Sequence, residues 1–373
     1  MTLSSPLLAA VPLVAGLMGP ALVGATPPQR PAPSAQADHR PPGAPGAGPR
    51  AARTGQATKA AGAARRTDVV EHVAARGPAD ERRVLGYWTP RRMAAALPLG
   101  LAGSVTGSLA GLTRTAQRDG GLLGGLTTPE RRPAAAERRP ALPQQTTYGA
   151  RWSAGGVVTK TTGRVFMTMN GADFVCSAST VRSANRDVVV TAGHCVKDGA
   201  GQWAANWTFV PGYRDGGGHP YGRYPARRMF VAGPWSRSAD DSHDVGMVVL
   251  GTSSGRHVAD VVGAQEIAFN RPRGGHAFGF GYPADPPYNG EHLVYCAGRL
   301  RDDPYGETRD QGLGCDMTAG SSGGPWLSGF DHDTGKGTLT SLSSFKYSDD
   351  HRTMYGPYFG DAVKTLFTTA ERA

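Results

Sequence analysis

The sequence has few cysteines, and none before residue 176, although the chain is 373 residues long. The four that are present, Cys176, Cys195, Cys296 and Cys315, fall into two pairs with eighteen residues between the members of each. Neither spacing is that of a CxxC metal site. Four cysteines allow three pairings, of which two local loops are the simplest. We expect two disulfides, which indicate an oxidising compartment, and neither a metal nor a cofactor.

The second half of the chain lacks any excess of positive charge. Residues 1–145 contain 18 basic residues (Lys and Arg) and 8 acidic residues (Asp and Glu). Residues 146–373 contain 22 basic and 22 acidic residues. The basic residues of the first half are scattered among Pro and Ala, without aromatic interleaving or a helical stripe. This pattern favours a solvated flexible segment over a nucleic-acid-binding surface, so no nucleic-acid partner is expected.

Long apolar runs suitable for a membrane span are also missing. The uncharged run 93–112 is diluted by one Pro and four Gly, whereas a span needs about 20 predominantly apolar residues. The earlier run 7–25 is apolar and ends in Val-Gly-Ala, small residues at the offsets that signal cleavage requires, although no Lys or Arg precedes it. We therefore expect a signal peptide at 1–25, a secreted extracellular protein and no membrane association after cleavage.

The composition changes along the rest of the chain. Residues 26–66 are Pro, Ala, Gly and Arg with almost no large apolar residues, which predicts disorder. Residues 67–145 are mixed, with room for a short helix in 69–97 and a second linker near 127–145. We assign 26–147 to a mostly disordered pro-segment and 148–373 to the folded domain.

From about residue 150 the chain consists of short runs rich in Val, Phe, Thr and Tyr, punctuated by Gly, Pro, Asn and Asp. This alternation indicates an all-β sandwich or barrel. Only the end, 359–373, has helical periodicity, because Val363, Leu366 and Phe367 fall at i, i+3 and i+4.

The stretch TAGSSGGPW, residues 318–326, sets two serines in a glycine-rich turn. A serine that attacks a carbonyl needs an exposed hydroxyl on a tight turn and backbone N–H groups aimed at the developing oxyanion. Gly320 supplies the conformational freedom for such a turn. We therefore interpret Ser322 as the nucleophile and Ser321 as its neighbour, with the N–H groups of Gly320 and Ser322 as the oxyanion hole.

Two further segments supply the partners that a serine nucleophile needs. In VVVTAGHCV, residues 188–196, a β-branched run leads into a small-residue turn that carries His194, and a neutral imidazole is the usual base for a hydroxyl. In HDVGMVVL, residues 243–250, Asp244 precedes a buried strand and is suited to hold the imidazole tautomer. Asp240 and Asp241 compete with it for this role.

The order of these residues along the chain is informative. His, then Asp, then Ser is the chymotrypsin-like order, whereas α/β-hydrolases run Ser, Asp, His. No alternating strand and helix pattern surrounds the two His residues after Ser322. An α/β-hydrolase esterase is therefore excluded.

On the motifs TAGHC and GSSGGP, supported by DVGMVVL, residues 150–370 resemble the trypsin/chymotrypsin-like serine peptidases. The chain is similar in particular to the bacterial secreted branch that includes glutamyl endopeptidases. The resemblance implies two antiparallel six-stranded barrels, about 155–255 and 265–360, with the site between them and peptide hydrolysis through an acyl-enzyme. One departure is Ser321, where many animal relatives have the Asp that pairs with a freed N-terminal amine, so that activation switch is not implied.

Specificity is left open by the sequence. Asp316 has the offset of the carboxylate with which the trypsin branch binds Arg and Lys, but the adjacent Cys315 departs from that branch. Hydroxyls such as that of Thr318 suit the glutamyl branch, yet its His is missing from TSLSSFKY, residues 340–347. Ser343 and Ser344 are expected on the strand that pairs with the substrate backbone.

The sequence thus predicts a monomeric secreted serine endopeptidase that acts on proteins or peptides. Two alternatives remain: an inactive binding module that keeps the fold, and an esterase on the same barrel.

Overall fold

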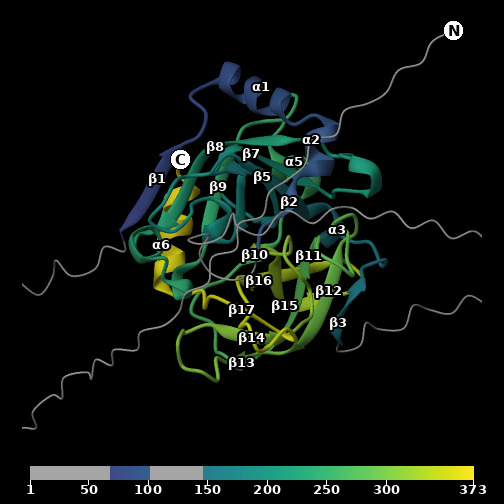
Figure 1. The fold of residues 1–373 in the computed structure, drawn as a ribbon, viewed down its shortest axis with the longest axis vertical. Helices are drawn as coiled ribbons and strands as arrows, with labels where there is room; N and C mark the ends of the chain where they lie inside the picture. Colours follow the sequence, from purple (N-terminus) through teal and green to yellow (C-terminus); the bar gives the residue numbers. More distant parts are fainter. Residues whose placement is uncertain (1–67, 101–145) are drawn as a thin grey trace, which may run out of the picture. The chain divides into compact units, whose positions relative to one another are not determined.

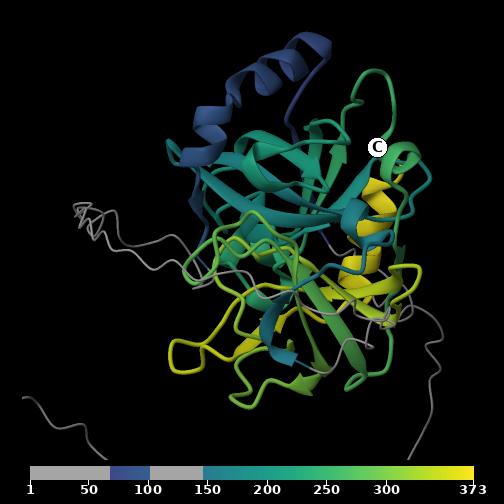
Figure 2. The same ribbon diagram turned by 90° about the vertical axis from the view of Figure 1, so that its right-hand side faces the viewer.

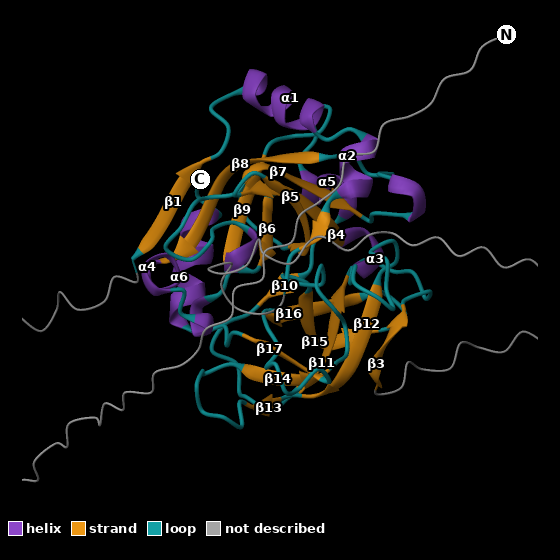
Figure 3. Cartoon of the chain, viewed as in Figure 1, coloured by secondary structure: helices purple, strands orange, loops and turns teal. Residues whose placement is uncertain are grey.

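The computed structural model describes residues 68–100 and 146–373 (Figure 1). The predicted signal at 1–25, the start of the predicted pro-segment and the linker 101–145 lie outside the described residues. Figure 3 shows that strands predominate in the described part, with short helices around them. Among the helices described there, none has the length and apolar character needed to cross a bilayer.

Six strands of the first half close into an antiparallel barrel in the order β8-β7-β4-β5-β6-β9, and β9 pairs with β8 to complete the ring. Their β-branched and aromatic side chains contribute many residues to the main core, which explains the continuous apolar runs in the sequence. One of the two expected six-stranded barrels is therefore confirmed. Its strands are β4 (Thr162–Met169), β5 (Ala172–Thr180), β6 (Val188–Thr191), β7 (Ala205–Pro211), β8 (Tyr224–Ala232) and β9 (Gly246–Leu250).

Short helical segments join these strands and carry part of the candidate site. The two that matter most are η1, which follows β6, and η3, which precedes β9. Their bounds and those of the other segments are α3 (Val158–Thr161), η1 (Gly193–Cys195), η2 (Asp215–Gly217), α4 (Gly233–Ser238), η3 (Asp241–His243) and α5 (Val258–Val262).

The second half is also β, but within residues 146–373 its named ladders do not close. A six-stranded sheet runs β10-β16-β15-β11-β12-β3, and a separate three-stranded sheet runs β13-β14-β17. The expected second closed barrel is thus not confirmed. The strands are β3 (Thr146–Arg151), β10 (Glu266–Ile267), β11 (His276–Gly281), β12 (Val294–Arg299), β13 (Arg301–Asp302), β14 (Gln311–Gly314), β15 (Pro325–Asp331), β16 (Lys336–Leu342) and β17 (Thr353–Gly356).

Residues 68–100, which we call the strap, are ordered and lie on the first barrel, although most of 26–147 was expected to be disordered. The strap contains β1 (Val69–Val73), α1 (Pro78–Tyr87), α2 (Pro90–Ala95) and β2 (Leu97–Pro98). Strand β1 pairs with β8, β2 pairs with β5, and α1 packs on β7 and β8. Figure 2 shows the blue helices of the strap at the top of the molecule. The short helix expected in 69–97 is therefore a pair of helices.

The C-terminal helix α6 (Asp361–Ala370) confirms the helical periodicity. Val363, Leu366 and Phe367 are buried, and the helix packs on β8 and β9 of the first barrel. The second half of the chain thereby returns to the first barrel, as the yellow helix in Figure 1 shows.

Candidate active site

His194 lies on η1, immediately after the buried strand β6. The turn is fixed by the disulfide between Cys176 of β5 and Cys195, one of the two disulfides that the sequence predicts. Gly193 is required next to it, because a Cβ there would lie 2.8 Å from Oδ1 of Asp244. The turn thus holds the imidazole against the carboxylate with little freedom.

Asp244 approaches His194 from the end of η3, just before β9. Its Oδ2 lies 2.7 Å from Nδ1 of His194, and its Oδ1 accepts the backbone N–H of His194 at 2.7 Å. The hydroxyl of Ser344 donates to Oδ2 at 2.5 Å. The carboxylate is therefore hydrogen-bonded on both oxygens, and its partners orient the ring with Nδ1 protonated and Nε2 free to accept.

The two buried groups stabilise each other's charged forms. Burial lowers the pKa of His194, but the charge and hydrogen bond of Asp244 outweigh it and raise the pKa above 6.5. Burial raises the pKa of Asp244, and the His194 ring together with the three hydrogen bonds brings it below its usual value. Asp244 is consequently an anion under all conditions in which His194 can act as a base.

The two adjacent serines have different environments. The Ser321 hydroxyl donates to the carbonyl of Thr318 at 2.7 Å. The Ser322 Oγ is buried and has no hydrogen-bond partner among the described residues, and the same is true of Nε2 of His194. A buried polar group without a partner costs free energy, and a catalytic role is one reason why such a group persists. Ser322 thus fits the nucleophile's environment, and Ser321 does not.

Backbone contacts hold Ser322 beside the His194 turn. Its carbonyl accepts the N–H of Ser177 on β5 at 2.8 Å, and the Cys195 sulfur lies 3.7 Å from the same oxygen. Gly320 and Gly323 have φ values of 92° and 81°, a region that favours glycine. A Cβ at Gly323 would also lie 2.4 Å from the carbonyl of Ser177.

The N–H of Gly320, one of the two groups expected in the oxyanion hole, already donates to a carbonyl. Its acceptor is the oxygen of Leu99 in the strap, at 3.4 Å. Leu99 is 3% exposed, and its own N–H donates to the carbonyl of Val175 on β5 at 3.1 Å. No local sequence pattern indicates this contact, because it joins segments more than 200 residues apart.

The two acidic competitors of Asp244 lie on the same turn but make other contacts. Asp240 accepts the N–H of Ser242 and lies 3.0 Å from Nδ1 of His243. Asp241 is partly buried beside Asp244, and burial together with that negative charge raises its pKa to about 6. Asp244 is the one whose oxygens contact His194.

Most side chains expected to bind the substrate form hydrogen bonds within the protein. Asp316 accepts the N–H of Gly149 at 2.6 Å and the hydroxyl of Tyr288 at 2.7 Å. Thr318 exchanges hydrogen bonds with the backbone of Asp285. The hydroxyl of Ser343 accepts the indole N–H of Trp326 at 3.1 Å.

Ser344 and Lys346 are site residues whose contacts the sequence did not predict. The hydroxyl of Ser344, a residue that stays predicted for the strand that pairs with the substrate backbone, donates to Asp244. Two residues later, Nζ of Lys346 donates to the carbonyls of Cys315 and His351, and burial lowers its pKa to about 8. The second predicted disulfide, Cys296–Cys315, constrains Cys315, whose carbonyl accepts a hydrogen bond from this ammonium.

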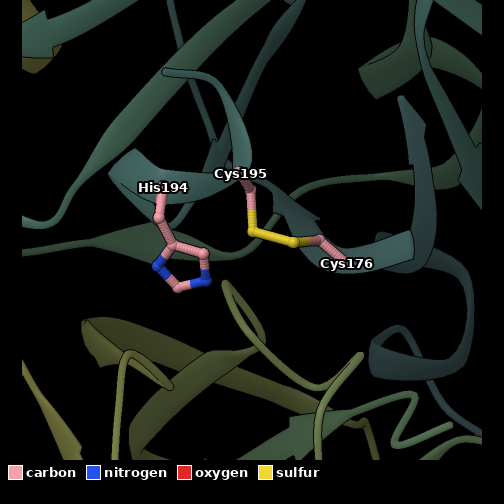
Figure 4. A group of neighbouring side chains, drawn as sticks. All are labelled: Cys176, His194 and Cys195. Carbon is pink, nitrogen blue, oxygen red and sulfur yellow. A yellow bond between two sulfur atoms is a disulfide. The ribbon is translucent and has the colours of Figure 1, made fainter. Parts of the chain in front are cut away.

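Three residues with potential metal-ligand atoms, one of them His194, lie close together. Cys176, His194 and Cys195 bring their potential ligand atoms within 4.8 Å of one another (Figure 4). Both sulfurs are joined in the disulfide, and a metal ligand needs a thiolate. Nδ1 of the ring is also engaged by Asp244. This group of residues therefore does not fit a metal ion.

Comparison with solved structures finds close resemblance over the protease-like part of the chain. The protease Anisep of Arthrobacter nicotinovorans is 39% identical, with a TM-score of 0.55, over 57% of this chain and 96% of that one. A thermostable serine protease, AL20, from an extremophilic microorganism is 40% identical, with a TM-score of 0.55, over 58% of this chain and 99% of that one. No family model matches the sequence.

Two curated proteins match shorter segments. An extracellular metalloprotease of Bacillus subtilis is 34% identical over 104 residues, which is 28% of this chain and 33% of that protein. A glutamyl endopeptidase of Bacillus licheniformis is 38% identical over 71 residues, 19% of this chain and 22% of that protein. The matches thus span about a third and about a fifth of the length of these curated relatives.

Proposed function

Because this chain belongs to the trypsin-like serine proteases, we propose that it is a secreted serine endopeptidase that cleaves proteins or peptides through an acyl-enzyme. The observation that carries the proposal is the Nδ1 to Oδ2 contact of 2.7 Å between His194 and Asp244, combined with two buried atoms that lack partners. Those atoms, Nε2 of His194 and Oγ of Ser322, are the two between which a proton must pass.

In the proposed reaction, Ser322 Oγ attacks the substrate carbonyl carbon while its proton passes to Nε2 of His194. Asp244 stabilises the imidazolium and keeps its orientation. The N–H groups of Gly320 and Ser322 stabilise the negative oxygen of the tetrahedral intermediate, an effect worth about 3–4 kcal/mol per donor in comparable sites. The imidazolium then protonates the leaving amine, the C–N bond breaks, and water releases the acyl group by the same steps.

Secretion and the remaining domain assignments form part of the proposal. Secretion is supported by the two disulfides and by the extracellular relative. We retain a signal at 1–25, a pro-segment at 26–147, the protease domain at 148–373 and a monomeric state as proposals. A two-barrel arrangement is supported by the bridge between Phe345 and Tyr355, which links the chain after β16 to β17.

A labelling experiment tests the proposal. A fluorophosphonate probe should label the secreted protein, and Ser322→Ala should abolish both labelling and casein hydrolysis. Ser321→Ala is the matched control, because that hydroxyl is bonded to Thr318 and should not react. Labelling that survives in Ser322→Ala but not in Ser321→Ala would contradict the assignment. Turnover of esters without peptides would favour the esterase, and no labelling at all would favour the binding module.

A further inference from the structure

We infer that the strap is a retained inhibitory subunit of this protease. Residues 68–96 form an anchor that adds strand β1 to the edge of β8 in the first barrel. Residues 97–99 form a plug, in which the carbonyl of Leu99 accepts the N–H of Gly320. The strap stays bound when the chain is cut in residues 101–145. The inhibitory part of this inference rests on the proposed function, whereas the retention of the strap does not.

Strand β1 covers an edge of β8 in the first barrel. Strand β8 pairs with β7 only near its start, through Tyr224 and Pro225. Its later part, Arg228–Ala232, pairs with all five residues of β1 in antiparallel register. Without β1, the backbone N–H and C=O groups of Arg228–Ala232 that now pair with β1 would form an open sheet edge. Such an edge is a template for aggregation. The strap therefore completes the sheet and does not merely lie against it.

Side chains reinforce the same end of the anchor. Asp68 lies 2.6 Å from Arg237, and its carbonyl accepts the N–H of Gly233 at 2.6 Å. Glu71 lies 2.9 Å from Arg228. Asp68 and Glu71 of the strap thus face Arg237 and Arg228, and this charge complementarity favours the observed pairing of β1.

The helices bury apolar side chains in the barrel surface. Trp88 is 1% exposed and donates its indole N–H to the carbonyl of Asn206 at 2.5 Å. Met93 is also buried, as part of the main core cluster. In return, Arg223 of the barrel donates to the carbonyls of Leu85 and Trp88. A buried aromatic anchor with satisfied polar contacts is typical of a stable interface.

The plug reaches the site itself. Leu97 and Pro98 pair in parallel with Phe174 and Val175 of β5. Leu99 then places its carbonyl on the Gly320 N–H, the donor that the substrate's oxygen needs in the proposed reaction. A substrate must displace this carbonyl before the oxyanion hole is complete.

The contacts that hold the strap do not involve the linker 101–145. Every contact described above joins residues 68–99 to residues 173–320, and none passes through residues 101–145. A break in that range leaves all of them intact. The partner of this barrel surface is thus a segment of the same chain, held noncovalently.

Retention is tested with the full chain, in which the recognition sequence of an unrelated site-specific protease replaces residues 134–136. In a Ser322→Ala background the cut protein is passed through gel filtration without denaturant. The strap fragment should elute with the protease domain, and Trp88→Ala should release it. A fragment that separates from the parent protein under these conditions overturns retention, whether or not the protein is a protease.

The plug is tested by replacing Leu97, Pro98 and Leu99 with glycines in the full chain. The initial rate of peptide hydrolysis should rise at least tenfold, while Arg82→Ala, an exposed strap residue, should leave it unchanged. Leu99→Pro is the milder variant, because proline lacks the N–H that donates to Val175. A parent that is active and a variant that is no faster would overturn the plug.

A second readout does not require activity. Hydrogen exchange of the peptide that contains residues 318–324 should accelerate in the triple-glycine variant, because Gly320 loses its acceptor. Unchanged exchange there would overturn the plug even if Ser322 proved not to be a nucleophile. Failure of the inference and failure of the proposed function are therefore distinguishable.

Discussion

Asp310 offers the sharpest test of the electrostatics around this site. It lies just before β14 and is fully buried, and neither of its carboxyl oxygens has a hydrogen-bond partner among the described residues. Burial, together with the negative charges of Asp244, Asp241 and other carboxylates, raises its pKa from 3.8 to about 8. At neutral pH the folded protein therefore keeps a proton on Asp310 that the unfolded chain has lost.

This difference in bound protons makes the free energy of unfolding depend on pH. Between pH 3.8 and pH 8 the folded state binds more protons at this position, so stability falls as pH rises, by about 1.4 kcal/mol per pH unit. At pH 7 the accumulated cost is about 4 kcal/mol. Asp310→Asn removes the titration and keeps the shape. The variant should match the parent near pH 4 and exceed it by about 4 kcal/mol at pH 7, with a thermal midpoint about 10 °C higher.

The measurement is the thermal midpoint of the full chain from pH 4.5 to pH 8.5, in a Ser322→Ala background that prevents self-digestion. Asp333→Asn, at an exposed turn, is the matched control and should follow the parent. Peptidase activity near neutral pH should be unaffected in Asp310→Asn with Ser322 intact, because Asp310 is already uncharged there. If the midpoints of Asp310→Asn and the parent run parallel across the whole range, the buried carboxyl is ionised or solvated and the reasoning fails.

Two further outcomes are expected. Because His194 must be neutral to accept a proton and its pKa lies above 6.5, kcat/KM of the active form should fall as pH drops, with a midpoint above 6.5; a midpoint below 6 would contradict the coupling to Asp244. Asp316→Asn should lower the free energy of unfolding by about 1–3 kcal/mol, because it weakens the bonds from Gly149 and Tyr288. It should not selectively slow cleavage after Arg or Lys, and a selective loss in a peptide panel at unchanged stability would return Asp316 to the role of a specificity residue.

The local motifs predicted most of the candidate site. A glycine-rich turn at 318–324 and a small-residue turn at His194 carry their conformational requirements in adjacent residues, so the sequence alone indicates them. The sequence left Asp240 and Asp241 as competitors of Asp244, because all three lie on one turn. The partner of His194 is the residue whose carboxylate contacts the ring, and this contact is visible only in the folded chain.

Features that depend on distant pairing were not predictable in the same way. Ser344 supports Asp244 across 100 residues, and the strap meets the barrel across still longer separations. The composition of 69–97 allowed a helix but contained nothing to indicate a partner for Trp88. In the second half, alternating strands indicated β structure, but closure of a sheet depends on register, which short runs do not specify.

Three consecutive residues of β5 contact the plug, the His194 turn and the Ser322 turn. The carbonyl of Val175 accepts the N–H of Leu99 in the plug, Cys176 is bonded to the turn of His194, and the N–H of Ser177 donates to the carbonyl of Ser322. The side chain of Ser177 also donates to the carbonyl of Gly320 at 2.9 Å. The plug, the His194 turn and the Ser322 turn all contact one strand of a closed barrel, and this strand sets their relative positions. If the plug inhibits the enzyme as proposed, we expect it to leave without rearranging His194 and Ser322, because their contacts with β5 do not pass through the plug.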